Sequence, residues 1–139
     1  MRWNKGKIVV RMQEGLRINH EFFIDSDIYE GFKKAFKDEN ILHTNEEYAQ
    51  EKGFREKVMH GNILNGFVSF FVGELLPDKK VLIQKQEISF HKPVYLNDNL
   101  IFEAILSEVY ESVNSFVFKF KFKSESGLVA KGKVQIGKI

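Results

Sequence analysis

The segment FVFKFKFK, residues 116–123, alternates apolar and charged side chains with a period of two. Successive side chains of a β-strand point to opposite faces of a sheet. One face of the strand therefore carries four phenylalanines, Phe116, Phe118, Phe120 and Phe122, and the other carries Val117, Lys119, Lys121 and Lys123. A sheet with one packed and one hydrated face needs a second layer of structure to cover the packed face.

Similar alternation predicts three further strands after Lys80, with the sequences VLIQKQEISF, NLIFEAILSEVY and GLVAKGKVQI. Four long strands in succession indicate an antiparallel sheet. Near the N-terminus, Leu16–Ile24 mixes β-branched and aromatic residues as a strand does, and Lys7–Met12 is expected to add an edge strand.

One long apolar helix is predicted over Asn62–Leu76, because this stretch is apolar almost all round and carries a single charge, Glu74. It is the only segment large enough to cover the packed face of the sheet. A curved antiparallel sheet wrapped around one central helix is the hot-dog fold, of the α+β class. With 139 residues and no Pro-rich or Gly/Ser-rich linker, the chain is expected to form one domain over residues 1–139.

Two shorter helices precede the central one. Asp25 or Ser26 can cap a helix that runs toward Phe36. Thr44 and Glu47 have the spacing of a capping box, and the helix that they begin is expected to stop at Gly53.

The composition excludes several classes of function. The formal charge of +2 is too small to indicate a nucleic-acid partner, and without cysteine no thiolate chemistry is available. No P-loop, dinucleotide fingerprint or Gly-x-Ser-x-Gly elbow occurs. The four histidines lack metal-ligand spacing, so we expect neither a metal nor a cofactor. The charged N-terminus and the absence of a long apolar run predict a cytoplasmic protein without membrane attachment.

Candidate chemistry begins with DENILH, which places Asp38, Asn40 and His43 in a turn between two predicted helices. A carboxylate and an imidazole that meet at one water can hold it, take its proton and return a proton to a substrate. The alternative is structural: Asp38 caps a local turn, and His43 packs beside Thr44.

A second candidate element is VMHGNIL, which places Gly61 just before the apolar helix. Its backbone N–H would point outward at the positive end of the helix dipole, where it can stabilise negative charge on a thioester carbonyl. The alternative is a tight turn or helix start that requires a positive φ angle.

Taken in order, these stretches resemble the MaoC-like and R-specific enoyl-CoA hydratase family. The family pattern is DxNPxH, then a hydrophobic-His-Gly element before a helix, then FxxPVxxGD. This chain has DENILH, MHGNIL and FHKPVYLND, so the resemblance runs from about Phe36 to Leu100.

The resemblance implies that Asp38 and His43 are the catalytic pair, that Asn40 supports their loop, and that Gly61 supplies the oxyanion N–H. It also places Ser69 where these hydratases keep a small polar residue near the active site. For Ser69, the alternative is a helix serine bonded to its own backbone. His60 is expected to shape the turn before Gly61.

Two positions depart from the family pattern. Ile41 replaces the proline of DxNPxH, which frees a φ angle and is expected to loosen Asp38 relative to His43. Asn97 replaces the glycine of the GD pair, and asparagine tolerates the left-handed backbone that such a turn needs.

The implied function is that of a carbon–oxygen lyase, which adds water to a 2-enoyl thioester or removes it from a 3-hydroxyacyl thioester, as in fatty acid metabolism. The acyl group would be carried by CoA or by acyl carrier protein, with Arg55, Lys57 and Lys92 as candidate contacts to the carrier's phosphates. A homodimer is expected, because hot-dog domains that this chain resembles pair edge to edge.

Two other functions remain open from the sequence. A hot-dog thioesterase needs a carboxylate near the thioester carbonyl, and the helix offers only Glu74 at its far end. A non-catalytic acyl-thioester-binding subunit would keep the fold while the loop has drifted, as the isoleucine at position 41 suggests.

Overall fold

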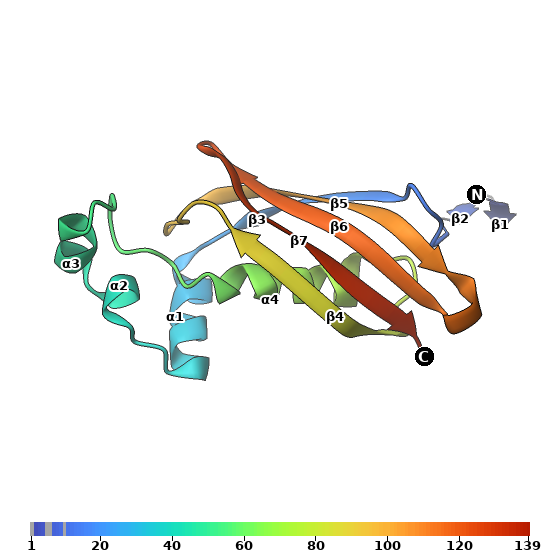
Figure 1. Cartoon of the computed structure of the whole chain (residues 1–139), viewed down its shortest axis with the longest axis horizontal. Coiled ribbons are helices and arrows are strands. Elements are labelled where there is room, and N and C mark those ends of the chain that lie inside the picture. The colour runs from blue at the N-terminus through green and yellow to red at the C-terminus, as the bar shows by residue number, and fades with distance from the viewer. Residues whose placement is uncertain (1, 5–6, 10) are drawn as a thin grey trace.

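The computed structural model describes residues 2–4, 7–9 and 11–139, and its main feature is a strongly curved antiparallel sheet (Figure 1). The strand order is β3-β5-β6-β7-β4. The strands are β3 (Arg17–Phe23), β4 (Val81–Phe90), β5 (Asn99–Tyr110), β6 (Ser115–Ser124) and β7 (Gly127–Lys138). All the predicted strands of this sheet are confirmed to within a few residues.

The register of β6 confirms the two-faced pattern of the sequence. Phe116, Phe118, Phe120 and Phe122 are all at most 5% exposed, whereas Lys119 and Lys121 face solvent. The strands β5, β6 and β7 follow one another as hairpins, but β4 pairs with β7 at the far edge of the sheet rather than with β5. β3 forms the opposite edge through its pairing with β5.

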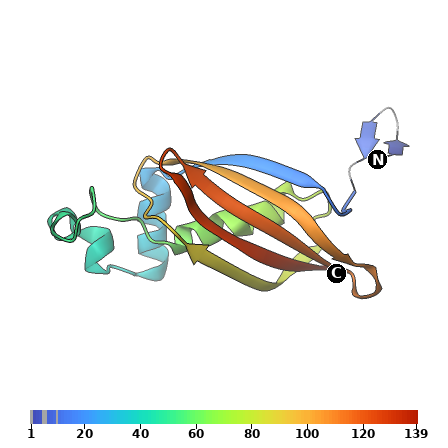
Figure 2. The ribbon, with the colours of Figure 1, turned by 45° about the horizontal axis from the view of Figure 1, so that its top comes forward.

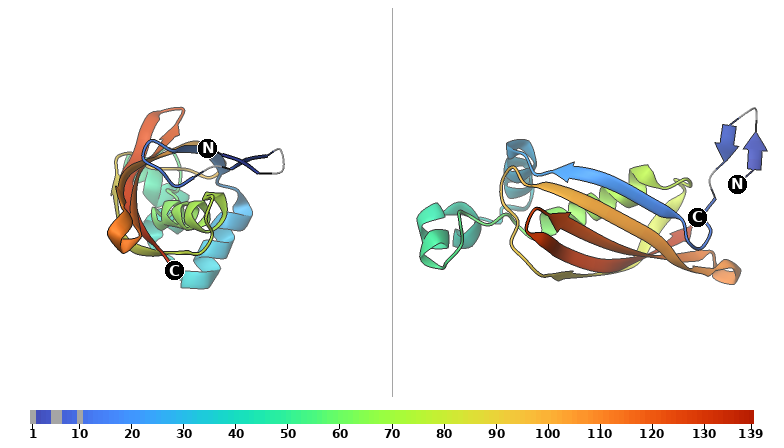
Figure 3. Two further views of the ribbon diagram at one scale, coloured as in Figure 1. Left: turned by 90° about the vertical axis from the view of Figure 1, so that its right-hand side faces the viewer. Right: turned by 90° about the horizontal axis from the view of Figure 1, so that it is seen from above.

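The central helix lies in the concave side of this sheet, as the end-on view in Figure 3 shows. It consists of α4 (Asn62–Phe70), which continues into the π-helical turn η1 (Phe71–Leu75). Its fully buried side chains include Leu64, Val68 and Phe71, and Phe71 packs against Phe102 and Phe118 at ring-centroid distances of 5.0 and 5.1 Å. A sheet wrapped around one buried helix is the hot-dog fold, so the predicted fold class is confirmed.

The widening of the last helical turn was not predicted. Gly73 lies within it, and glycine has a low helix propensity, so the departure from regular α-helix costs little there.

Three short helices extend beyond one end of the sheet (Figure 2). They are α1 (Ser26–Phe36), α2 (Ile41–Thr44) and α3 (Glu46–Glu51). The side chain of Asp25 caps α1 by accepting from Ile28 N at 2.8 Å, as predicted.

The predicted capping box is wrong. Asn45, not Thr44, caps α3, and its side chain accepts from Tyr48 N at 2.9 Å. Thr44 ends α2, where its hydroxyl donates to the Asn40 carbonyl at 3.2 Å. The two residues are adjacent and both are good N-caps, so the sequence alone did not show which of them begins α3.

At the other end of the molecule, β1 (Arg2–Asn4) and β2 (Lys7–Val9) form a separate two-stranded hairpin. The predicted edge strand at Lys7–Met12 is therefore wrong in its pairing, and residue 10 lies outside the described residues. A 3-10 turn, η2 (Glu111–Val113), connects β5 to β6. Within the part of the chain that the structure describes, none of the helices has the length and apolar character needed to cross a membrane.

Candidate functional site

The turn between α1 and α2 positions Asp38. Lys37 ends α1 in the left-handed conformation, with φ of 57°, and turns the chain out of the helix. Asn40 then begins α2, with its side chain accepting from Leu42 N at 2.9 Å. One oxygen of Asp38, Oδ1, accepts from Asn40 N at 3.2 Å. Asp38 thus stabilises a local turn, which is the structural role that the sequence offered as the alternative. Its other carboxylate oxygen remains available to a ligand.

His43 is held from both its backbone and its ring. Tyr29 donates from its hydroxyl to the His43 carbonyl at 2.7 Å, and His43 Nδ1 lies 2.7 Å from the carbonyl oxygen of Val58. A carbonyl can only accept, so Nδ1 carries the proton. This tautomer leaves Nε2 as the ring nitrogen that can act as a base.

His60 contacts both Asp38 and His43. It is 2% exposed, its Nε2 donates to the Asp38 carbonyl at 2.8 Å, and its ring lies 4.2 Å from that of His43 between centroids. Its Nδ1 is buried and has no hydrogen-bond partner among the described residues. The sequence assigned His60 only to the turn before Gly61. Its bond to Asp38 joins segments 22 residues apart, which no local pattern reveals.

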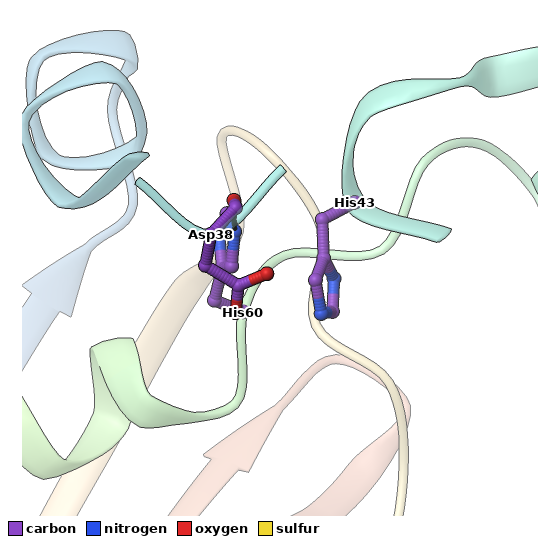
Figure 4. A group of neighbouring side chains, drawn as sticks. All are labelled: Asp38, His43 and His60. Carbon is purple, nitrogen blue, oxygen red and sulfur yellow. Dashed lines mark hydrogen bonds between the residues drawn. The ribbon is translucent and has the colours of Figure 1, made fainter. Parts of the chain in front are cut away.

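The three side chains form one cluster, shown in Figure 4, in which a ligand atom of each lies within 4.8 Å of those of the other two. Two groups that hydrogen-bond the same water at about 2.8 Å can be at most about 5.6 Å apart. The spacing of Asp38 and His43 therefore suits one shared water. The same donor set is of the type that holds a metal ion, although one nitrogen of each histidine is already bonded to a backbone carbonyl.

Gly61 precedes α4 with φ of −57° and ψ of −35°. The alternative that it serves a positive φ angle is therefore wrong. A side-chain carbon at this position would lie 3.1 Å from the ring of Phe90, so glycine keeps this approach open. Among residues 11–139, the hydrogen bonds of this region leave the Gly61 N–H unused.

His43 and Gly61 line the same small cavity, of about 290 Å³. Its walls are otherwise largely apolar, with Phe54, Val58, Met59, Leu64, Phe90 and Val94 among the lining residues. His43 and Gly61 therefore border one apolar space that can hold a short acyl group.

A second and larger hollow, of about 980 Å³, meets the small cavity at Lys92 and Pro93, which line both. Arg55 lines it as well, stacked 4.2 Å from the ring centroid of Tyr95 and 3.6 Å from a carboxylate oxygen of Asp98. Lys57, the third predicted phosphate contact, instead lies over the Tyr29 ring at 4.7 Å.

The remaining predicted positions are also placed by the structure. Ser69 is exposed on α4, about 12 Å along the helix axis from Gly61, and does not line either hollow. Asn97 adopts the left-handed conformation with φ of 69°, as its replacement of glycine predicted.

Ile41 occupies the first position of α2, where proline is favoured. The preceding Asn40 has ψ of 136°, which also suits a residue before proline. Ile41→Pro should therefore raise the free energy of unfolding by about 0.4–1 kcal/mol. Denaturant melts of the variant and of Ile41→Ala, which leaves φ free, measure this. A less stable proline variant would mean that α2 begins differently in solution.

Comparison with known proteins supports the relationship suggested by the sequence. A family model described as MaoC like domain matches residues 10–121. An (R)-specific enoyl-CoA hydratase of Rhodospirillum rubrum is 36% identical over 76 residues, which are 55% of this chain and 52% of that enzyme. The chain thus spans about half the length of this relative. A mitochondrial 3-hydroxyacyl-[acyl-carrier-protein] dehydratase of Arabidopsis thaliana is 24% identical, over 88% of this chain and 74% of that protein.

Solved structures show the same fold. The (R)-hydratase from A. caviae involved in PHA biosynthesis superimposes with a TM-score of 0.83 and 21% identity, covering 91% of this chain and 97% of that one. The match spans nearly the whole hydratase, so the hot-dog architecture is shared over its full extent.

Proposed function

This chain belongs to the MaoC-like family, and we propose that it is a hydratase or dehydratase that acts on 2-enoyl and 3-hydroxyacyl thioesters. The observation that carries the proposal is that Asp38 and His43 belong to one cluster with ligand atoms within 4.8 Å, and that His43 and Gly61 line the same apolar cavity. The Gly61 N–H has no hydrogen-bond partner among residues 11–139. Relatives of the chain named as enoyl-CoA hydratases and 3-hydroxyacyl dehydratases support the same reaction.

In the hydration direction, Asp38 and His43 orient the water, and His43 Nε2 takes one of its protons. The water oxygen bonds to C3 of the enoyl group as the C2–C3 π electrons shift toward the thioester. The Gly61 N–H stabilises the negative charge that develops on the carbonyl oxygen. The proton then returns to C2, which completes a syn addition because both protein groups act from one face.

The two adjoining hollows fit the two parts of such a substrate. The apolar cavity beside His43 suits a short acyl chain, and the larger hollow offers Arg55 and Lys92 to the phosphorylated arm of the carrier. Both CoA and acyl carrier protein present their acyl group on an arm of this kind.

A thioesterase is less well supported, because the one acid of the central helix is remote from the cavity. Glu74 lies 13 residues after Gly61, or about 20 Å along the helix, and pairs with Lys79 at 3.9 Å. The other alternative is a non-catalytic acyl-binding subunit, which would retain the cavity and bind thioesters without turnover.

The proposal is tested by the loss of conjugated enoyl-thioester absorbance when the protein is mixed with crotonyl-CoA or a crotonylated carrier protein. Formation of the R-3-hydroxybutyryl thioester supports it. Binding of the thioester with no turnover of either substrate would favour the acyl-binding subunit, and release of free thiol would favour the thioesterase.

The contact of His60 with Asp38 leads to a further expected result. His60→Phe keeps a ring against His43 and Phe32 but cannot donate to the Asp38 carbonyl. A small displacement of a reacting group costs much of the rate, so kcat should fall roughly 10- to 100-fold with little change in KM. His60→Gln, which can replace the Nε2 donor, should recover part of the loss. Equal rates for the two variants would limit His60 to packing.

We also propose a homodimer that pairs through the β4 edge of the sheet. This edge strand exposes apolar side chains, with Leu82, Ile83 and Phe90 between 39% and 52% exposed. Ile83→Glu should shift the protein to a monomer at micromolar concentrations, whereas Lys85→Glu on the same strand should not. Sedimentation equilibrium measures both. A monomeric mass for the unmodified protein at every concentration would rule out the dimer.

A further inference from the structure

The outer face of the sheet carries a square of four lysines. Lys119 and Lys121 on β6 lie directly opposite Lys133 and Lys131 on β7, respectively. All four side chains are exposed, and among the described residues none of them lies within 4.0 Å of a carboxylate oxygen. The whole chain has a net charge of only +2, so this lysine square is a local concentration of charge.

Like charges directly opposite each other in an antiparallel pair destabilise the sheet. Here two such pairs are adjacent. Lys121 and Lys133 each also face a glutamate on the other neighbouring strand, so the repulsion within the square is only partly compensated in the fold. A cost of this kind is expected where the charges serve binding rather than folding.

The lysine square also has a defined width. Glu103 on β5 lies opposite Lys121, and Glu87 on β4 lies opposite Lys133, so acidic side chains border the square on both sides. The positive strip is therefore about two strands wide, or roughly 10 Å. An α-helix has a diameter of about 10–12 Å with side chains, which matches the width of this strip.

The surface is hollowed where the lysines gather. A depression of about 650 Å³ on this face is lined by all four lysines and Arg17, by the acidic Glu87 and Glu103, and by apolar residues that include Ile88 and Ile105. A depression lined by five cationic and two acidic side chains, with some apolar surface, suits a helix that presents acidic residues one turn apart.

The lysine square leads toward the candidate active site. Lys123 follows Lys121 on the same face of β6, about 7 Å further along the strand, and lines the larger hollow together with Lys92. That hollow shares Lys92 and Pro93 with the lining of the cavity of His43 and Gly61. Lys123 pairs with Glu103 at 3.3 Å, so its charge is partly neutralised. Lysine side chains therefore continue from the outer face of the sheet to the site where an acyl thioester would enter.

We propose that the lysine square docks an acidic helix of a carrier protein, whose phosphorylated arm then reaches along Lys123 and Lys92 to the cavity. The inference rests on the proposed function and deepens it, since it makes a protein carrier rather than CoA the preferred bearer of the acyl group. Free CoA has no helix to place on the square and would use only the two hollows.

The test compares crotonyl-CoA with a crotonylated acyl carrier protein as substrates of the double variant Lys119→Glu, Lys131→Glu. Each new glutamate faces a remaining lysine, so two repulsive pairs become attractive, and Tm should rise by about 2 °C or more. At low salt, kcat/KM for the carrier substrate should fall at least about tenfold, as expected when steering charges are reversed. For crotonyl-CoA it should change less than twofold.

The matched control, Lys34→Glu with Lys80→Glu, changes the net charge equally at exposed positions away from this face and should leave both substrates unaffected. Equal loss for CoA and carrier substrates, or no loss for either, would overturn the docking proposal while the hydratase function stands. Loss of the dimer in the double variant would assign the face to a second copy of this chain. If the double variant lost only its binding to anionic vesicles, the face would be assigned to a lipid surface. Both outcomes contradict the proposal.

Direct titration of the carrier protein separates the two hypotheses if turnover fails. Should the unmodified protein hydrate neither substrate, the proposed function fails. Carrier binding that is tenfold tighter to the unmodified protein than to the double variant would still support the docking surface. Equal binding would overturn it.

Discussion

Asp38→Ala and His43→Ala should each lower kcat for hydration of crotonyl thioesters by about 100- to 10,000-fold, the range expected when a general acid or base is removed. Both groups handle one water in the proposed reaction, so neither can compensate for the other. The double variant should cost about as much as the worse single variant, because groups that act as a unit are not additive. Steady-state kinetics with both carriers measure these effects.

Two conservative variants separate chemistry from local structure. Asp38→Asn keeps an oxygen that can accept from Asn40 N, and His43→Asn keeps a donor near the Val58 carbonyl. If the turn were all that mattered, these variants should be active. We expect them to be nearly as slow as the alanine variants, with Tm within a few degrees of the unmodified protein because Asp38 is exposed. Normal rates for both would make the pair structural and favour the acyl-binding subunit.

The sequence predicted the fold well where the signal is local. The alternation along β6 is visible in the residues of that strand alone, so its two faces could be predicted. The burial of the central helix could be predicted from the apolar composition of Asn62–Leu76. The order of the strands in the sheet could not be predicted in the same way. β4 precedes β5 in the chain but pairs with β7, because the central helix and the sheet must close around each other, and no short-range pattern encodes that pairing.

The same distinction holds at the candidate site. The turn of Asp38 and Asn40 could be predicted from the sequence, since polar residues between two helices commonly cap a helix or form a turn. The contacts that fix the site were not. His43 bonds to Val58 and His60 bonds to Asp38 across 15 and 22 residues. Both bonds depend on how residues 38–43 pack against the irregular segment before α4. The signal that the sequence did offer was the histidine before Gly61 in the hydrophobic-His-Gly element, His60.

Replacing Gly61 by proline should reduce kcat by about 100- to 1,000-fold, the loss typical of removing one oxyanion donor. Proline removes the N–H that is proposed to receive the developing charge, and its fixed φ matches the −57° of Gly61 at the start of α4. The fold should therefore tolerate the change, which circular dichroism and Tm can check.

Gly61→Ala is the matched control, because it adds the same side-chain carbon 3.1 Å from Phe90 but keeps the N–H. The Phe90 ring is 52% exposed and can shift by the few tenths of an ångström required, so the alanine variant should lose activity far less than the proline variant. Both variants add the Cβ contact with Phe90, so the additional loss in the proline variant measures the replacement of the N–H by the ring Cδ. If both lost activity equally, close approach to Phe90 would explain the need for glycine. The developing charge would then have to be stabilised by another donor, of which the exposed N–H of Asn62 in the first turn of α4 is the nearest along the chain.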